Sequence, residues 1–230
     1  MANILAFEIS DQPGSLALLR DEQLVDERWL PGEQKTTQSF ALATQAILAD
    51  HGMKPADVDV VAICDGPGSF TGLRIGVTWA KVFCYSTGAN AVAVNTLEVL
   101  ARQANATARP LWSILNAYRK QLFVRKTLGG NEISATEIIG LEDFVSKLIE
   151  GDCIIGSGIS KIGDQIPAGV EVLDQELWIP KASTLGRIAS QVDPADFADY
   201  WKLSPKYYRM SAAEEKLLKA NASTNHSPEM

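Results

Sequence analysis

The run from Asp65 to Gly76, with the sequence DGPGSFTGLRIG, has the residue types and the spacing that come nearest to a chemical site. A glycine-rich turn between a strand and a helix can point backbone N–H groups at an anion, and the helix N-terminus adds a favourable partial charge. Such a turn would hold a phosphate group. The candidate phosphate or nucleotide cleft then comprises Gly66, Gly68 and Ser69 of this run, together with Glu8 and Ser10 of the first loop.

The spacing of this run differs from the known phosphate-binding fingerprints. No Gly-Lys-Ser or Gly-Lys-Thr closes it, as a Walker loop requires, and it lacks the glycine pattern of a dinucleotide site. In the alternative interpretation, Ser69 or Thr71 is the N-cap of the following helix. The glycines are then residues of a turn that needs unusual dihedral angles. This structural interpretation needs no ligand, and we favour it.

Histidine and nucleophile chemistry has little support in the sequence. The two histidines, His51 and His226, are far apart in the chain, whereas a metal-dependent enzyme needs clustered ligands. A serine hydrolase triad would have to use one of them, and the run from Gly156 to Ser160 lacks the pattern of a nucleophile elbow. We therefore predict no catalytic residue, no metal site and no cofactor of the chain's own.

Hydrophobic periodicity predicts the elements that must position these residues. In the first half we expect strands at 4–7, 15–20 and 23–30, a helix at 36–51, a strand at 58–64, a helix at 71–87, a strand at 90–94 and a helix from 96 on. In the second half we expect strands at 111–115, 121–128 and 132–138, a helix at 141–150, a strand at 153–155, a loop or weak helix at 157–166, a strand at 170–173 and a helix at 183–192. Both halves have the order βββαβαβα, which predicts an α/β fold of two lobes with mixed sheets.

The same pattern predicts the division of the chain. Residues 1–106 form an N-terminal lobe with the partner-binding helices, and residues 107–200 form a C-terminal lobe. Residues 201–219 form a C-terminal segment that can pack back on the first lobe. Residues 220–230 lack apolar residues to anchor them and are expected to be a disordered tail.

The helices at 36–51 and 71–87 have apolar residues around most of their circumference, which is more than one core can cover. Gly72, Gly76 and Ala80 recur every four residues and would form a smooth ridge for another helix, so that Gly76→Arg would disrupt subunit association. The alternative is a fully buried helix pair within one large core. The predicted partner-binding surface comprises Phe40, Ala43, Ile47, Gly72, Leu73, Gly76, Trp79, Ala80 and Phe83.

Charge and composition argue against several classes of protein. The chain has 21 Lys and Arg against 28 Asp and Glu, a net charge of −7, so we expect it to bind nucleic acid poorly on its own. No apolar run is long enough to span a membrane, and the N-terminus lacks the basic segment of a signal peptide. Three scattered cysteines fit a reducing compartment, which predicts a cytoplasmic protein.

Three runs of the sequence resemble the TsaB (YeaZ) family: GPGSFTGLRIG at 66–76, ILAFEIS at 4–10 and LSPKYYRMSAAE at 203–214. The resemblance implies an actin-like (ASKHA) fold and a non-catalytic scaffold or activating subunit. Its partner would be a TsaD-like catalytic subunit, a metal-dependent paralogue that transfers threonylcarbamoyl to an adenosine in the tRNA anticodon loop. The resemblance further implies a homodimer through the N-terminal helices when the chain is alone, a TsaE-like ATPase as a further partner, and ATP, ADP or tRNA only at the level of the complex.

The first loop departs from the pattern of this family. The family commonly has Asp-Thr-Ser or Asp-Thr-Ala where this chain has Glu8, Ile9 and Ser10, so one hydroxyl group is missing. Two other functions are alternatives. An autonomous actin-like ATPase or kinase would have to bind and turn over nucleotide alone, and a glycoprotease would need a histidine pair that the sequence lacks.

Overall fold

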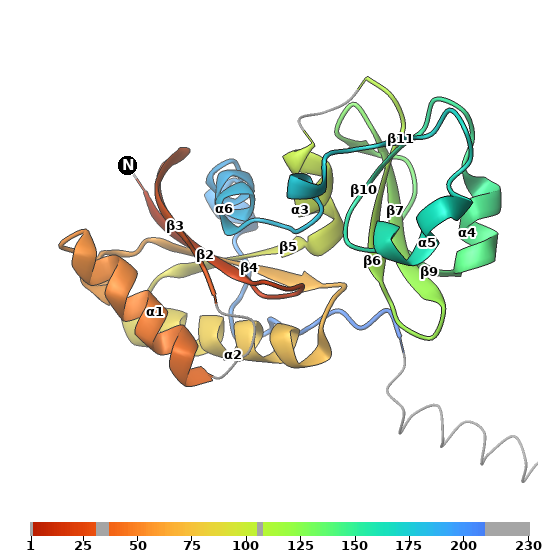
Figure 1. Cartoon of the computed structure of the whole chain (residues 1–230). Coiled ribbons are helices and arrows are strands. Elements are labelled where there is room, and N and C mark those ends of the chain that lie inside the picture. Colours follow the sequence, from red (N-terminus) through yellow and green to blue (C-terminus); the bar gives the residue numbers. More distant parts are fainter. Residues whose placement is uncertain (1, 31–36, 105–107, 210–230) are drawn as a thin grey trace, which may run out of the picture.

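The computed structural model describes residues 2–30, 37–104 and 108–209. Two β-sheets lie side by side in it, and helices pack against both (Figure 1). The predicted disordered tail, His226 and residues 210–219 lie outside the described residues.

The first sheet has the strand order β3-β2-β1-β4-β5. Its strands are β1 (Asn3–Glu8), β2 (Ser15–Arg20), β3 (Gln23–Trp29), β4 (Val60–Gly66) and β5 (Asn90–Asn95). Strands β1 to β3 form an antiparallel meander, and β4 and β5 continue the sheet in parallel with β1. Helices α1 (Thr37–Asp50) and α2 (Phe70–Thr87) lie on the same face of this sheet (Figure 1).

The second sheet has the order β11-β10-β6-β7-β8, and β9 also pairs with β7. Its strands are β6 (Leu111–Asn116), β7 (Gln121–Leu128), β8 (Asn131–Glu132), β9 (Glu137–Gly140), β10 (Cys153–Ile155) and β11 (Glu171–Val172). The remaining helices are α3 (Thr96–Gln103), α4 (Leu141–Lys147), α5 (Ile159–Ile162) and α6 (Ala182–Ser190). The first half has the predicted order βββαβαβα, and the second half has the same order except that two short strands, β8 and β9, stand where one strand was predicted. The duplicated, two-lobed architecture is confirmed.

The predicted strand at 132–138 is wrong, because the short strands β8 and β9 replace it. The main-chain N–H groups of Ile133 and Ser134 both donate to the carbonyl of Lys126, at 2.9 and 3.2 Å. Ser134 Oγ in turn accepts the N–H of Lys126 at 3.0 Å. A serine side chain that bonds to main-chain groups competes with the ladder of a sheet. The chain leaves the ladder here, and β9 pairs with the other end of β7.

Two helices do not follow the predicted division of the chain at residues 106 and 107. Helix α6 comes from the second half but packs on the first sheet, where Leu185 and Ile188 share a core with Ile4. Helix α3 lies between the sheets, with Val99 in that core and Leu97 in a core of the second sheet. The predicted division stays a prediction for the two sheets, and it does not describe the helices.

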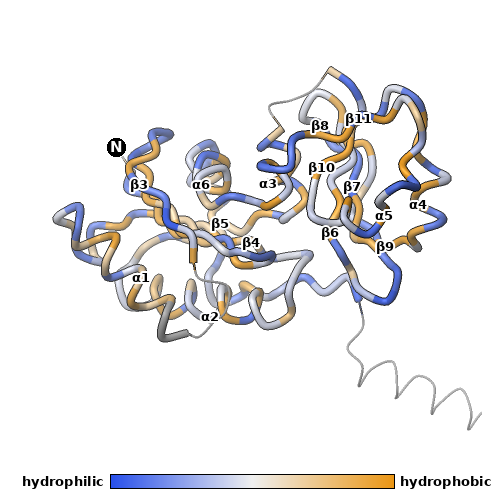
Figure 2. The backbone as a smooth tube through the Cα atoms, in the orientation of Figure 1, coloured by the Kyte–Doolittle hydropathy of each residue, from blue (hydrophilic) through white to orange (hydrophobic). Residues whose placement is uncertain are grey.

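Aromatic rings fill the core between the first sheet and helices α1 and α2. Phe7 of β1 contacts Phe40 of α1 and Trp79 of α2, with ring centroids 5.2 and 4.1 Å apart. Phe83 stacks on Trp79 at 4.6 Å. Burial of a ring of this size contributes on the order of 2 kcal/mol. Figure 2 shows hydrophobic residues along the central strands of both lobes, so each sheet has a core of its own.

The loop that follows β1 lies directly on the start of α2, and two glycines make this close approach possible. The N–H of Ser69 donates to the carbonyl of Ser10 at 2.7 Å. A Cβ atom on Gly68 would overlap with the main chain of Ser10, and a Cβ atom on Gly72 would overlap with the carbonyl oxygen of Ile9. At Gly76, one turn further along, a Cβ atom would lie 3.5 Å from Ile9 Cδ1, which is an ordinary contact.

Gly72→Ala is expected to lower the free energy of unfolding by about 1–3 kcal/mol, because the new methyl group pushes the main chain of Ile9 away. Gly76→Ala on the same helix is the matched control. It should leave the stability unchanged or raise it by up to about 1 kcal/mol, because alanine has the higher helix propensity. Urea unfolding followed by circular dichroism measures both variants, and equal stabilities would contradict the close contact at Gly72.

Candidate functional site

The glycine-rich turn joins the end of β4 to the start of α2. Ser69 is the N-cap of α2, and its Oγ accepts the N–H of Gly72 at 3.2 Å. Gly66 has a φ angle of +130°, which favours glycine, and a Cβ atom there would lie 2.6 Å from the carbonyl oxygen of Lys206. The turn therefore has the structural role of placing the helix under the first loop and beside residue 206.

The polar groups of the predicted phosphate cleft bond to one another. Glu8 is fully buried, and its carboxylate accepts the N–H of Ser10 at 2.8 Å and the hydroxyl of the same serine. The N–H of Ser69 is taken by the Ser10 carbonyl, and Gly66 faces Lys206. The structure thus brings Ser10, Gly68 and Ser69 together, and the Glu8 carboxylate is bonded to Ser10. This arrangement disfavours an anion.

A cavity of about 340 Å³ between the lobes adjoins this turn. The first loop contributes Asp11 to it, and the loop after β10 contributes Ser157. The Ser157 hydroxyl donates to Asp11 Oδ2 at 2.6 Å, so one hydrogen bond connects the two lobes. In the described part of the chain, Asp11 is the one carboxylate that lines this cavity, and the cation Lys161 lines it as well, so the lining charges balance and create no excess positive charge for a phosphate group.

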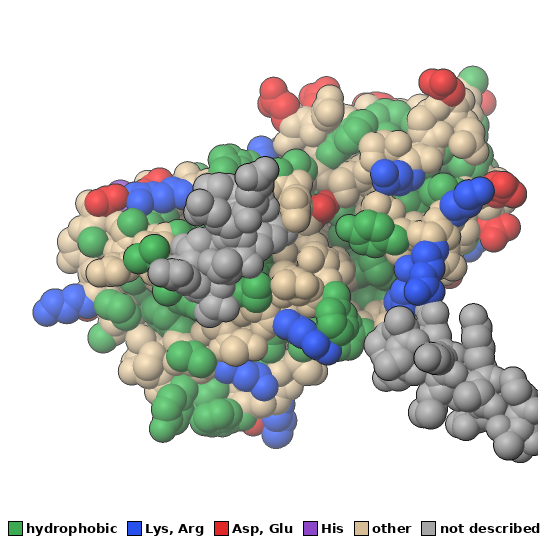
Figure 3. Space-filling view, turned by 60° about the horizontal axis from the view of Figure 1, so that its bottom comes forward, with side chains coloured by type: hydrophobic (Ala, Val, Ile, Leu, Met, Phe, Trp, Pro, Cys, Tyr) green, Lys and Arg blue, Asp and Glu red, His purple; other side chains and the backbone are tan. Residues whose placement is uncertain are grey.

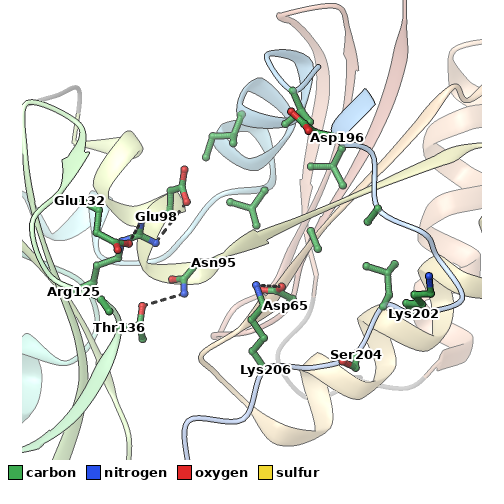
Figure 4. A pocket seen from close by; sticks show the side chains of 18 of the residues that line it. Asp65, Asn95, Glu98, Arg125, Glu132, Thr136, Asp196, Lys202, Ser204 and Lys206 are labelled. Atoms are coloured by element: carbon green, nitrogen blue, oxygen red, sulfur yellow. Dashed lines mark hydrogen bonds and ion pairs between the residues drawn. The ribbon is translucent and has the colours of Figure 1, made fainter. Parts of the chain in front are cut away.

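A larger interlobe cavity of about 790 Å³ is lined by charged residues from both lobes (Figure 4). Arg125 of β7 pairs with Glu132 at 2.6 Å and with Glu98 at 3.5 Å. Lys206 Nζ lies 2.9 Å from Asp65 Oδ2. Arg125 is shared by two carboxylates and Lys206 pairs with a third, so the cavity offers an ion-pair network rather than a reactive group.

Asp65 is the buried charge of this network. Its side chain is 5% exposed, at the end of β4, while the Lys206 side chain is 61% exposed. Burial raises the pKa of Asp65 above its ordinary value, and the hydrogen bond and charge of Lys206 only partly oppose this. The hydrogen bond to Asp65 raises the pKa of Lys206. The pair therefore stabilises the charged form of Lys206, whereas burial destabilises the charged form of Asp65.

The C-terminal segment, residues 198–209, connects the two lobes. Ala198 forms a bridge with Ala91 of β5, and the N–H of Lys206 donates to the Asp65 carbonyl at 2.7 Å. The Tyr208 hydroxyl accepts from the Asn95 amide at 3.0 Å. The guanidinium of Arg209 then reaches Gln121 of β7. The segment thus runs from an edge of the first sheet to the second lobe.

Metal ligands do not cluster in the part of the chain that the structure describes. No group of three or more His, Cys, Asp or Glu residues there could hold a metal ion. His51 lies 3.2 Å from Asp26, and Asp26 is also paired with Arg28 at 2.7 Å. No helix among these residues is long and apolar enough to span a membrane.

Most of the predicted partner-binding residues prove to be inside the protein. Ala43 and Trp79 are half-buried, and the other seven are buried: Phe40, Ile47, Gly72, Leu73, Gly76, Ala80 and Phe83. The first sheet and the first loop cover these seven residues, so direct partner contacts by them stay a prediction that their burial does not support. Gly72 and Gly76 face Ile9 of the same chain, so Gly76→Arg would disturb the fold rather than an interface.

Helices α1 and α2 nevertheless expose apolar side chains away from the core, and Figure 3 shows hydrophobic side chains on this side of the molecule. Leu42 of α1 is 58% exposed, and Val82 and Tyr85 of α2 are 61% and 68% exposed. We call these three residues the outer face. Tyr85 also contacts Trp201 of the C-terminal segment, which is 60% exposed, so the apolar surface continues there. A contiguous exposed apolar surface, such as that of Tyr85 and Trp201, is typical of interaction sites.

The residues that sequence reasoning missed come from separate segments. A cavity of about 350 Å³ is lined by Phe70 and Arg74 of α2, Tyr118 of the β6–β7 turn, and Tyr207 and Arg209 of the C-terminal segment. No spacing along the chain connects these segments. The two distinctive runs contained a signal, because GPGSFTGLRIG includes Phe70 and Arg74 and LSPKYYRMSAAE includes Tyr207 and Arg209.

Comparisons with known proteins agree with this fold. Residues 33–155 match the family model described as TsaD: tRNA N6-adenosine threonylcarbamoyltransferase. The chain is 27% identical to the Bacillus subtilis (strain 168) tRNA threonylcarbamoyladenosine biosynthesis protein TsaB over 231 residues, which cover 94% of this chain and 98% of that protein. The Escherichia coli (strain K12) protein of the same name is 32% identical over 114 residues, 48% of this chain and 49% of that one. The solved structure of YeaZ from Pseudomonas aeruginosa has a TM-score of 0.74 at 19% identity, over 90% of this chain and 100% of that one, which shows a shared fold.

Asp65→Asn is expected to keep or raise the free energy of unfolding at neutral pH, because it removes a buried carboxylate whose pKa is raised by burial. A carboxyl with a raised pKa stabilises the folded state fully below the pKa of the unfolded chain, and this contribution is lost as the pH rises through the folded pKa. The stability of the variant relative to the wild type should therefore increase from acidic to neutral pH. Denaturant unfolding at several pH values measures it. If instead the wild type becomes more stable than the variant as the pH rises, the Lys206 ion pair outweighs the cost of burying Asp65.

Proposed function

The chain belongs to the TsaB (YeaZ) family, and on this premise we propose that it takes part in the synthesis of threonylcarbamoyladenosine in tRNA as a non-catalytic subunit. It would bind and activate a TsaD-like catalytic subunit. The relatives that carry the name TsaB are biosynthesis proteins for this nucleoside, which supports the pathway. The exposed apolar surface of the molecule supports the role of a binding subunit within this pathway.

The outer face is the observation that carries the proposal. Leu42, Val82 and Tyr85 are large apolar side chains that the fold leaves more than half exposed, on two helices packed against one sheet. Their contact with a partner would remove apolar area from water, which is the main favourable term in association. Two neighbouring helices also present ridges into which a partner helix can pack. We therefore place the TsaD-like subunit on the outer face.

The same surface would serve a homodimer when the partner is absent. A twofold dimer uses one patch on both copies, so a single apolar face is sufficient for it. Homodimer and heteromer would then compete for the outer face. A TsaE-like ATPase, ATP or ADP, and tRNA would join at the level of the cytoplasmic complex, because the net charge of −7 gives the chain as a whole no attraction for nucleic acid.

The alternative of an autonomous actin-like ATPase or kinase has less support. Such an enzyme would hold phosphate groups between the lobes, where this chain has the carboxylates of Glu8 and Asp11. A glycoprotease would need clustered metal ligands, and the residues that the structure describes contain no such cluster. Turnover of ATP by the purified chain alone would favour the first alternative.

Val82→Glu is expected to weaken association with the TsaD-like subunit by about tenfold or more, because an apolar contact is replaced by a charge that must be desolvated. Ile149→Glu is the matched control, since Ile149 is also 61% exposed but lies after α4 in the second lobe. Isothermal titration calorimetry gives the dissociation constants, and circular dichroism checks the folds. If Val82→Glu binds as tightly as Ile149→Glu, the outer face is not the interface.

A further inference from the structure

The cavity of about 350 Å³ at the start of α2 is a separate feature from the outer face, and it shares Lys206 with the interlobe ion pairs. Three segments enclose it: the first turn of α2 with Phe70 and Arg74, the β6–β7 turn with Tyr118, and the C-terminal segment with Tyr207 and Arg209. We call it the Arg74 pocket. Its size is within the range of small-molecule sites in proteins.

The charge of the Arg74 pocket is opposite to that of the chain. Its lining includes Arg74, Lys206 and Arg209 and no carboxylate, although Asp and Glu outnumber Lys and Arg by 28 to 21 in the sequence. Lys206 is compensated by Asp65 outside the lining. Arg74 Nε donates to the Tyr207 hydroxyl at 2.9 Å, and Arg209 donates to Gln121 and to the Tyr118 carbonyl. Among the described residues, both arginines therefore have only neutral hydrogen-bond partners, and their charge is available to an anion.

Aromatic rings form the walls of the pocket. The Phe70 and Tyr207 rings lie 5.0 Å apart, and the Arg74 guanidinium lies 3.8 Å from the centroid of Phe70. Phe70 and Tyr207 are each 46% exposed, and Tyr118 is 71% exposed. Exposed ring faces next to guanidinium groups are suited to the stacking of a planar base.

The backbone holds Tyr118 at the pocket in an uncommon conformation. Tyr118, Arg119 and Lys120 have φ angles of +58°, +51° and +58°, three successive left-handed residues without a glycine. Bulky residues rarely adopt this region, and such outliers concentrate at ligand-binding sites. The Asn116 side chain accepts the N–H of Tyr118 at 2.9 Å and so supports the turn.

We propose that the Arg74 pocket binds an aromatic base that carries a phosphate group. The phosphate would lie between Arg74 and Arg209, as guanidinium groups bind phosphate oxygens in pairs, and the first turn of α2 would add the positive end of a helix dipole. The base would stack on Tyr118. The same chemistry is presented by a free ribonucleotide and by an unpaired nucleotide of an RNA strand.

The test uses the purified full chain in isothermal titration calorimetry at low ionic strength. The probes are the four common ribonucleoside monophosphates, adenosine, inorganic phosphate and a short single-stranded RNA. We expect saturable binding of at least one monophosphate, about tenfold tighter than either adenosine or phosphate alone, because base and phosphate contacts add. Tighter binding of the RNA strand than of any monophosphate identifies RNA as the source, and equal or weaker binding identifies the free nucleotide.

Variants locate the site. Arg74→Gln and Tyr118→Ala should each weaken binding by about tenfold, since they remove one charge-assisted contact and one stacking face. Arg187→Gln is the control for charge, because Arg187 is an exposed arginine of α6 that lines another cavity. It should change the affinity by less than about twofold. Val82→Glu should bind the probes like the wild type, which separates this proposal from the partner-binding proposal. The absence of saturable binding to any probe, or equal losses in Arg74→Gln and Arg187→Gln, would overturn the proposal.

Discussion

The close contact between the first loop and the start of α2 determines the geometry of the first lobe. Ile9 and Ser10 lie against Gly68 and Gly72 at distances that leave no room for a side chain. This contact seats α2 on the sheet and directs its large apolar residues either into the core or away from it. It also occupies the N–H of Ser69, which an anion beside the first loop would need. The same steric constraint therefore disfavours the binding of a phosphate by the turn. It also determines which side of α2 is exposed to solvent.

The sequence predicted the order of elements well, because period-two and period-3.6 patterns depend on local burial alone. The sequence-based prediction failed where tertiary contacts determine the local structure. The strand at 132–138 is interrupted because the hydroxyl of Ser134 replaces a ladder bond, which no periodicity reveals. The small residues of α2 were expected to receive another helix, whereas Gly72 and Gly76 face Ile9 of the first loop. A helix with two apolar sides does not indicate which side faces its own sheet. The Arg74 pocket could not be found from spacing, since its residues come from positions near 70, 118 and 207.

Helix α2 supports two different surfaces along its length. Its first turn contributes a guanidinium and an aromatic ring to the Arg74 pocket, whereas its later turns carry Val82 and Tyr85. The first surface is selective for charge and the second for shape and apolar area. Because both are fixed to one rigid helix, a partner seated on the later turns would lie at a fixed position relative to whatever occupies the pocket.

The bond between Asp11 and Ser157 and the C-terminal segment fasten the two lobes at separate places. Enzymes that work by closing two lobes around a substrate need a hinge that opens at low cost. In this chain an opening motion would have to break the Ser157 hydrogen bond, and the segment that ends at Arg209 ties the lobes together as well. Each of these interlobe contacts thus adds to the free energy that an opening of the two lobes would cost in this chain.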